Sequence, residues 1–289
     1  MSVGDDRRAE PARKPRSTLL DTPTPPNPGL TPRARTAWRA VASVAAALLL
    51  VFGVVQTLSV LSHGERTFTR SFPTDVVVVD IQVSSGSVEV VAADVDEITV
   101  TATVSDGFRA TGADQEIVDD RLVLTGTCPL YLSDFCAVHY DVEVPADVAV
   151  TARVDDGPIR IVGVSGPVDV SSDNSGMEIV GVSGPLTIHS DNGSLRGENL
   201  RSASVEASTD NGPVELAFAT APEMVIATSD NGSVEVRLPE VAGDYRVETD
   251  ADNGSTEVDV ATDPASGRLV VLGSDNGDLR VLGSGTTER

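Results

Sequence analysis

The segment SDNGSVEV, residues 229–236, belongs to a turn motif that returns along the second half of the chain. Its copies are SDNSGMEIV (172–180), SDNGSLRG (190–197), TDNGPVEL (209–216), ADNGSTEV (251–258) and SDNGDLRV (274–281), with a weaker copy in VDDGPIRI (154–161). The motif glycines, from Gly157 to Gly277, are spaced by 17 to 23 residues. A nearly constant period of about 20 residues indicates one repeated structural unit that is too small to bury its own apolar face.

Each period holds two short strands separated by turns. After Gly232, for example, Val234 and Val236 alternate with Glu235 and Arg237, which is the pattern of a half-buried strand. We therefore predict an all-β fold, a β-solenoid-like stack of two-strand repeats about 4.8 Å apart. Because Asn-Gly is also a strong hairpin signal, antiparallel pairing is the alternative. Parallel pairing is favoured by the single phase of the motif and by the hydroxyl residues that precede it, namely Ser172, Ser190, Thr209, Ser229 and Ser274.

The sequence before the repeats divides into three parts. Residues 1–36 are rich in proline and poor in apolar residues, which predicts a disordered tail. Residues 37–62 include a run of 22 uncharged residues, 40–61, that would span about 33 Å as a helix and predicts a transmembrane segment. A cleaved signal peptide is the alternative. Residues 67–150 read as a strand-rich lead-in or cap, and 151–285 as the repeat domain.

Charge is distributed unevenly along the chain, whose net charge is −23. Residues 1–40 carry eight basic and four acidic side chains, a sum of +4, so the remainder sums to −27. The basic residues before the apolar run place the N-terminus in the cytoplasm and the strand-rich part outside it by the positive-inside rule. An acidic chain of this kind is not expected to bind nucleic acid.

The Asp-Asn-Gly corner has an architectural and a functional interpretation. Glycine and asparagine tolerate positive φ, and aspartate can bond the backbone two residues on, so a turn explains the motif. These turn residues are Asn192, Gly193, Asn211, Gly212, Asn231, Gly232, Asn253, Gly254, Asn276 and Gly277. If the corners stack, the aspartates form a column that calcium could bridge, which leaves calcium as a possible ligand. The candidate calcium ligands are Asp173, Asp191, Asp210, Asp230, Asp252 and Asp275.

Few other residues point to chemistry. Cys128 and Cys136 are the only cysteines; a disulfide is the simplest role for them outside the cytoplasm, while their seven-residue spacing does not suit a metal site. His63, His139 and His189 are expected to have ordinary surface or strand roles. The sequence lacks a G-x-S-x-G elbow, a P-loop and an H-E-x-x-H motif. We expect no enzymatic activity and no cofactor beyond the calcium alternative.

The segment HYDVEVPADVAVTARVDDGPIRIVGVSGPVDVSSDNSG, residues 139–176, followed by the DNG units, resembles the DUF4097 family of candidate adhesins. The resemblance is carried by Tyr140–Pro145 and by the Gly-Val-Ser-Gly cadence at 157–166 and 176–184, and it covers about 70–285. It implies an extracytoplasmic β-strand-repeat domain, also called a toast-rack domain, of the bacterial envelope. Some relatives are joined to membrane segments found in envelope-stress regulators. No site residues carry over.

The sequence therefore predicts a single-pass membrane protein that displays a β-repeat domain at the bacterial cell envelope, with an adhesin-like or scaffolding role. Its partner would be an envelope or surface protein or a glycan, cationic or neutral in character because the domain is acidic. The alternative is an envelope-stress sensor or regulatory subunit that signals through the tail to a cytoplasmic partner. A β-helical polysaccharide-active enzyme is less favoured, since the short turns leave no room for a catalytic cleft.

Overall fold

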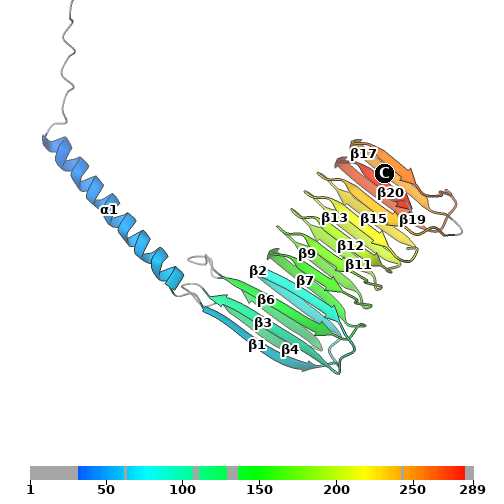
Figure 1. The fold of residues 1–289 in the computed structure, drawn as a ribbon, viewed down its shortest axis with the longest axis horizontal. Helices are drawn as coiled ribbons and strands as arrows, with labels where there is room; N and C mark the ends of the chain where they lie inside the picture. Colours follow the sequence, from blue (N-terminus) through cyan, green and yellow to red (C-terminus); the bar gives the residue numbers. More distant parts are fainter. Residues whose placement is uncertain (1–31, 62–63, 107–110, 129–135, 242–243, 284–289) are drawn as a thin grey trace, which may run out of the picture. The chain divides into compact units, whose positions relative to one another are not determined.

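The computed structural model describes residues 32–61, 64–106, 111–128, 136–241 and 244–283. Its internal contacts divide the chain into two units, Met1–Gly53 and Val54–Arg289. Within the described residues the only helix is α1 (Pro32–Leu61), and strands make up nearly all the rest (Figure 1). The all-β class predicted for the region after residue 62 is therefore confirmed.

Helix α1 begins earlier than the sequence indicates. Residues 32–36, assigned above to a disordered tail, are helical, and Pro32 suits a first turn because its fixed φ is already helical. The rest of the predicted tail, residues 1–31, lies outside the described residues, and so does His63. No helix in the described part of the chain is both long enough and apolar enough to cross a membrane. The transmembrane assignment of residues 37–62 is therefore not supported.

The strands form two sheets that share one strand, β2 (Val78–Ala92). Sheet A contains, in spatial order around β2, β1 (Gly64–Pro73), β3 (Glu97–Asp106), β6 (Ala137–Val144), β2, β8 (Ile159–Val162), β10 (Met177–Val180), β12 (Leu195–Leu200), β14 (Val214–Phe218), β16 (Val234–Leu238), β20 (Leu279–Gly283) and β18 (Thr256–Asp259).

Sheet B contains, in the same order, β4 (Gly112–Val118), β5 (Arg121–Thr127), β2, β7 (Ala149–Asp156), β9 (Val168–Ser172), β11 (Leu186–Ser190), β13 (Ser204–Thr209), β15 (Met224–Ser229), β19 (Leu269–Asn276) and β17 (Arg246–Asn253). Strand β2 passes from sheet B to sheet A near Gly86, whose φ of 141° suits a residue without a side chain.

Every described pairing between the repeats is parallel. A DNG corner joins a strand of sheet B to the next strand of sheet A, as between β9 and β10, and we call such a pair of strands a layer. Each strand pairs with the equivalent strand of the neighbouring layer, so β9 pairs with β11 and β10 with β12. The parallel arrangement is thus confirmed, and the hairpin alternative is wrong for the described repeats.

The order of the layers departs from the order of the chain at both ends. The last layer along the chain, β19–β20, lies between β15–β16 and β17–β18, so that β17–β18 ends the stack. At the other end, β2 lies between β5 and β7 in sheet B and between β6 and β8 in sheet A. The domain boundary expected at 150/151 falls inside β7, and β2 pairs with strands on both sides of it.

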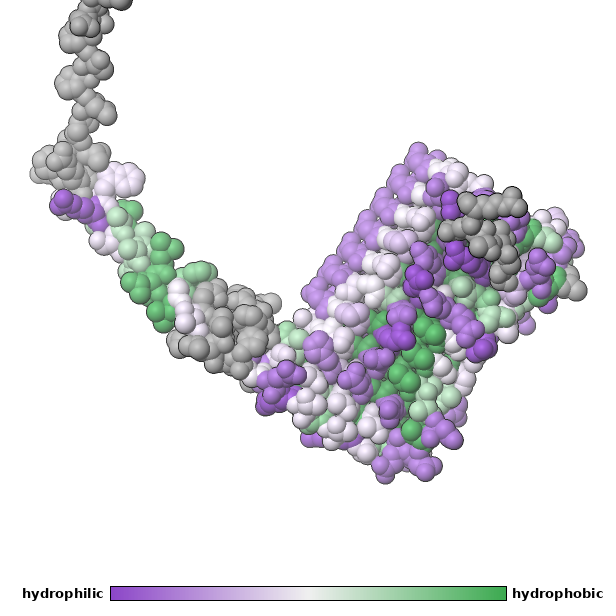
Figure 2. Space-filling model, viewed as in Figure 1, coloured by the Kyte–Doolittle hydropathy of each residue, from purple (hydrophilic) through white to green (hydrophobic). Residues whose placement is uncertain are grey.

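The core lies between the two sheets and follows from the alternation in each strand. In β8 and β10 the side chains of Ile159, Ile161, Met177 and Ile179 point inward and are almost completely buried, while the residues between them are partly exposed. Polar residues point outward, and Figure 2 shows them as a hydrophilic margin along one side of the stack. Aliphatic side chains fill the interior, as the low aromatic content of 3% requires.

Candidate functional site

The DNG corners stack into a ladder of asparagine side chains. In each layer the asparagine amide nitrogen Nδ2 donates a hydrogen bond to the carboxamide oxygen Oδ1 of the asparagine in the neighbouring layer, over 3.0–3.3 Å. The order of the ladder is Asn174, Asn192, Asn211, Asn231, Asn276 and Asn253, and Asn174 in turn donates to Asp156. The ladder independently confirms that the last layer along the chain is inserted before the terminal one.

The same asparagines also hold the backbone of the corner. Asn211, for example, donates from its Nδ2 and from its backbone N–H to the carbonyl oxygen of Asp191 in the neighbouring layer. The Nδ2 group therefore bonds both a side chain and a carbonyl of that layer, as in the asparagine ladders of stacked β-structures. The asparagine is therefore repeated because it bonds neighbouring layers to each other, in addition to forming the turn.

Hydroxyl groups before the corner supply a second column of bonds. Thr209, Ser229 and Ser274 are buried, and each donates to the carbonyl oxygen of the corner glycine in the neighbouring layer. Ser172 and Ser190 are equally buried but have no hydrogen-bond partner in the described part of the chain. The hydroxyl residues that favoured parallel stacking in the sequence thus point into the structure.

The register corrects one position of the motif. A Cβ atom on Gly193 would lie 2.0 Å from the carbonyl oxygen of Ser175, and Met177 pairs with Leu195, so Ser175 and not Gly176 is the equivalent of Gly193. Corner positions 157, 175 and 193 are therefore separated by 18 residues each, and the unequal spacings of the glycines disappear here. Counting glycines misplaced the corner because a serine occupies it.

The corner aspartates are the candidate calcium ligands predicted from the sequence. They line up in register, as the pairing of Ala251 with Ser274 and of Asn253 with Asn276 shows for Asp252 and Asp275. Among the described residues, however, no three His, Cys, Asp or Glu side chains are grouped so that they could hold a metal ion. At the start of the column, burial raises the pKa of the Asp155 carboxyl, and the charges of Asp173 and Asp156 add to this effect. Asp230, Asp252 and Asp275 line one hollow together with Asp250, so calcium binding at the corners stays a prediction.

The outer face of sheet A carries a row of charged side chains, one from each of nine neighbouring strands. By register the row consists of Asp141, Glu89, Arg160, Glu178, Arg196, Glu215, Glu235, Arg280 and Glu257. We call it the charged row. Its members follow one another at the strand spacing of about 4.8 Å, with six carboxylates and three guanidinium groups.

Each arginine of the charged row contacts carboxylates on neighbouring strands. Arg160 bridges Glu89 at 3.3 Å and also contacts Glu178, and Arg196 contacts Glu215 at 3.3 Å. These side chains are 40–57% exposed, so solvent screens each pair and its contribution to stability is small. Their regular placement therefore matters more for what the face can bind than for the stability of the fold.

Two hollows lie along the charged row and meet at Arg196. The larger, about 440 Å³, is bounded by Arg160, Glu178 and Arg196, with Pro158 and Met177 among its apolar walls. The smaller, about 280 Å³, is lined by Arg196, Gly197, Glu198, Asn199, Glu215, Leu216, Ala217, Glu235 and Arg237. The row and its hollows form an extended surface, charged along the row and partly apolar in the hollows, on which a linear ligand could lie. The sequence hinted at this only through the alternating Glu235 and Arg237.

The described histidines lie on the outer faces of the sheets. The Nδ1 atom of His139 is 2.8 Å from the Oγ of Ser87. His189 lies 3.0 Å from the Oγ of Ser208 and 3.3 Å from a carboxylate oxygen of Asp191. Serine, histidine and aspartate are the groups of a hydrolase triad, but His189 and Asp191 are about half exposed and line neither hollow of sheet A.

The predicted disulfide is present. Cys128 and Cys136 are bonded, with their Cα atoms 5.7 Å apart, and they join the end of β5 to the start of β6. Ser84 of β2 accepts the Cys128 backbone N–H with its Oγ, and Thr111 contacts the Cys136 sulfur. The bond thus fixes the antiparallel end of the stack to β2.

Comparisons with known proteins identify only distant structures. No family model and no curated protein matches the chain, so the DUF4097 resemblance is not confirmed. Similar solved structures include a candidate adhesin from Parabacteroides merdae ATCC 43184 (13% identity, 76% of this chain and 96% of that chain, TM-score 0.41) and one from Bacteroides fragilis NCTC 9343 (10%, 75% and 97%, 0.39). A candidate cell adhesion protein from Clostridium sporogenes ATCC 15579 matches with 6% identity, 76% and 100% coverage and a TM-score of 0.35. Likeness at this level says nothing about what the chain binds.

Proposed function

We propose that residues 64–283 form a β-solenoid that acts outside the cytoplasm as an adhesin-like or scaffolding surface, and that ligands bind along the charged row of sheet A. The observation that carries this proposal is the row itself, which continues across nine strands and has two hollows that meet at Arg196. Repeat structures commonly bind along such extended faces.

The ligand is a linear polymer that is neutral or cationic. Six carboxylates against three guanidinium groups make the row acidic on balance, so an anionic polymer would be repelled. The Cys128–Cys136 bond supports a location outside the cytoplasm, since disulfides persist in oxidising compartments.

Binding of the full chain to immobilised linear polysaccharides tests this proposal. The panel contains a neutral β-glucan, cationic chitosan and anionic heparin, and binding is measured by biolayer interferometry. We expect the neutral or the cationic polymer to bind and heparin not to bind. Arg196→Gln should weaken binding by about tenfold, because Arg196 lines both hollows of the charged row. Arg153→Gln, on the outer face of sheet B, is the matched control. Equal effects of the two variants, or preference for heparin, would contradict the proposal.

A further inference from the structure

The terminal layer, β17–β18, leaves one edge of each sheet open. Among the described residues, β17 (Arg246–Asn253) pairs only with β19 and β18 only with β20, and the outer side is occupied only just before β17, where Tyr245 is bonded to Ala261 and Asp263. Strands β19 and β20 follow β17 and β18 along the chain but pair on their inner side. The layer β17–β18 is therefore the last layer in space, at the far end of the stack (Figure 1). An open edge presents a row of backbone N–H and C=O groups to which another strand can be added.

The direction of the outward groups follows from one hydrogen bond. The backbone N–H of Arg246 donates to the carbonyl oxygen of Arg268 on the inner side of β17. Since successive residues of a strand point their backbone groups to opposite sides, the N–H groups of Glu248 and Asp250 also point inward. The N–H of Thr249 therefore points outward at the centre of the open edge.

The open layer is strongly acidic. Glu248, Asp250, Asp252, Glu257 and Asp259 are exposed on it, and Arg246 is its only basic residue. These carboxylates repel a second copy of this chain, whose net charge is −23. They attract a strand that carries arginine or lysine at its outward positions.

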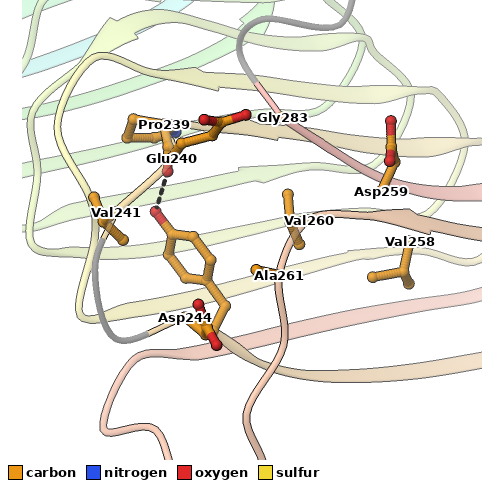
Figure 3. Close-up of a pocket in the computed structure, with 10 residues that line it drawn as sticks. Pro239, Glu240, Val241, Asp244, Val258, Asp259, Val260, Ala261 and Gly283 are labelled. Atoms are coloured by element: carbon orange, nitrogen blue, oxygen red, sulfur yellow. Dashed lines mark hydrogen bonds between the residues drawn. The ribbon is translucent and has the colours of Figure 1, made fainter.

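The inner side of the same layer exposes apolar surface. Val258 is 41% exposed, although its register partner Val281 is completely buried. Val247 and Val260 are only partly buried. Two hollows of about 450 and 410 Å³ adjoin the layer, and both are lined by Val258 and by Tyr245, which is anchored by a 2.8 Å bond from its hydroxyl to the carbonyl oxygen of Pro239. Figure 3 shows Val241 on one side of the smaller hollow and Val260 with Val258 on the other.

The asparagine ladder also ends here with an unused acceptor. Asn253 donates its Nδ2 protons to Oδ1 of Asn276 and to the carbonyl oxygen of Asp275. Each other asparagine of the ladder accepts a bond at Oδ1, but no donor to Oδ1 of Asn253 occurs in the described residues. The next rung of the ladder would have to come from a partner.

We propose that the open layer β17–β18 is an acceptor site for an extended segment of another protein, with basic residues at its outward positions and apolar residues at its inward positions. The segment adds a strand to the sheet edge, its apolar side chains cover Val247 and Val258, and its basic side chains face the carboxylates. This site shares Glu257 with the end of the charged row, but it lies at the sheet edge and does not depend on the function proposed for the row.

A labelled peptide of the length of β17 tests this site on the full chain. The peptide is an acetylated eight-residue strand that alternates arginine and valine, and binding is measured by fluorescence polarisation. A peptide that alternates arginine and proline has the same charge, but it lacks the N–H of every second residue and its prolines hold it near the polyproline conformation, so it fits the sheet edge less well. We expect the arginine–valine peptide to bind at least about tenfold more tightly than the arginine–proline peptide.

Two variants locate the site. Thr249→Pro removes the outward N–H without touching the bonds to β19 and should abolish the difference between the two peptides. Because this variant could unfold the layer, the double variant Glu248→Gln with Asp250→Asn, both exposed in β17 and outside the charged row, provides a second test and should weaken peptide binding by about tenfold. Asp169→Asn, on the exposed outer face of sheet B, is the matched control.

Four outcomes would overturn the proposal. The first is equal binding of the two peptides, which would mean plain attraction to an acidic protein. The second is an equal loss of binding in Asp169→Asn and in the double variant. The third is self-association of the full chain in sedimentation that the peptide does not reverse, which would assign the edge to a second copy. The fourth is a loss caused by Arg196→Gln, which would place the peptide on the charged row instead.

Discussion

The side-chain amide of Asn211 donates a 3.0 Å hydrogen bond to the carboxamide oxygen of Asn192, which lies 19 residues earlier in the chain. This contact repeats between neighbouring layers and joins corners that are far apart in sequence. The turn motif therefore serves the cohesion of the stack, while the two binding surfaces proposed above are the outer face of sheet A and the terminal layer.

Removal of one asparagine from the middle of the ladder should destabilise the stack. Asn211→Ala loses the bonds to Asn192 and to the carbonyl oxygen of Asp191, and it leaves the amide of Asn231 with the carbonyl oxygen of Asp210 as its remaining acceptor. We expect a loss of about 1–2 kcal/mol in the free energy of unfolding, measured by urea denaturation. Thr187→Ala, an exposed change on sheet B, is the control and should have an effect below about 0.5 kcal/mol. An equally small effect in Asn211→Ala would mean that the ladder does not contribute to stability.

A side chain on a corner glycine should be far more damaging. In Gly193→Ala the new Cβ would lie 2.0 Å from the carbonyl oxygen of Ser175, so the two layers would have to separate. We expect a loss of more than about 3 kcal/mol or failure to fold. Gly267→Ala places a Cβ where no atom lies within 4 Å and serves as the control. Similar melting temperatures of the two variants would show that the corners do not pack as described.

Reduction of the disulfide should lower stability moderately. The Cys128–Cys136 bond closes a short loop, for which the chain-entropy relation gives about 2–3 kcal/mol. We expect the double variant Cys128→Ser with Cys136→Ser to melt at a lower temperature and to be insensitive to reductant. If the wild-type chain carried two free thiols after isolation from cells without reductant, the proposed location outside the cytoplasm would lose its support.

The attachment of the terminal layer should weaken in acid. Ser255 donates its backbone N–H and its hydroxyl to a carboxylate oxygen of Asp278, and these bonds lower the pKa of the Asp278 carboxyl. A lowered pKa in the folded state stabilises the protein above the ordinary pKa of about 3.9, and this stabilisation is lost as the pH falls through the lowered value. Hydrogen exchange of β17–β18 should therefore accelerate, relative to β11–β12, in strongly acid solution.

Asp278→Asn should show the same loosening already at neutral pH. Asp169→Asn should leave the exchange of β17–β18 unchanged, since Asp169 lies in β9, far from the terminal layer in the order of pairing. If Asp278→Asn exchanges like the wild type at pH 7, the carboxylate of Asp278 does not hold this layer.

Calcium should leave the stability of the protein unchanged. The contacts that join the corners are made by asparagine amides, and the described aspartates form no group that could hold a metal ion. We expect the melting temperature in millimolar calcium to equal that in a chelator. If calcium raises the melting temperature and this rise disappears in Asp210→Asn, calcium does bridge the stacked aspartates.

The repeat was predictable because its information is local. The alternation of Val234 and Val236 with polar residues indicates a strand, and the glycine corners indicate the turns. The hydroxyl residues before the corners favour a parallel register. The Cys128–Cys136 disulfide was also predictable, since two lone cysteines a few residues apart have few other roles. The beginning of α1 at Pro32 was missed, because a proline-rich segment does not reveal that its last proline opens a helix.

The order of the layers and the candidate sites were not predictable in the same way. The return of β19–β20 into the stack depends on contacts between segments that are remote in sequence, such as Asn276 with Asn231, and the motif is the same in every layer. The charged row arises from one residue on each of nine strands and becomes visible only in register, where Arg160 meets Glu178. Ser175 was overlooked as a corner for the same reason.

Disulfide trapping between corners tests the layered stack and its order most directly. Asp230→Cys with Asp275→Cys places two cysteines in neighbouring layers, whose Cα atoms at about 4.8 Å lie within the range for a disulfide. Asp230→Cys with Asp252→Cys places them two layers apart, at about 9.6 Å. We predict rapid oxidation of the first pair and none of the second; oxidation of the second pair, or of neither, would contradict the stack of corners.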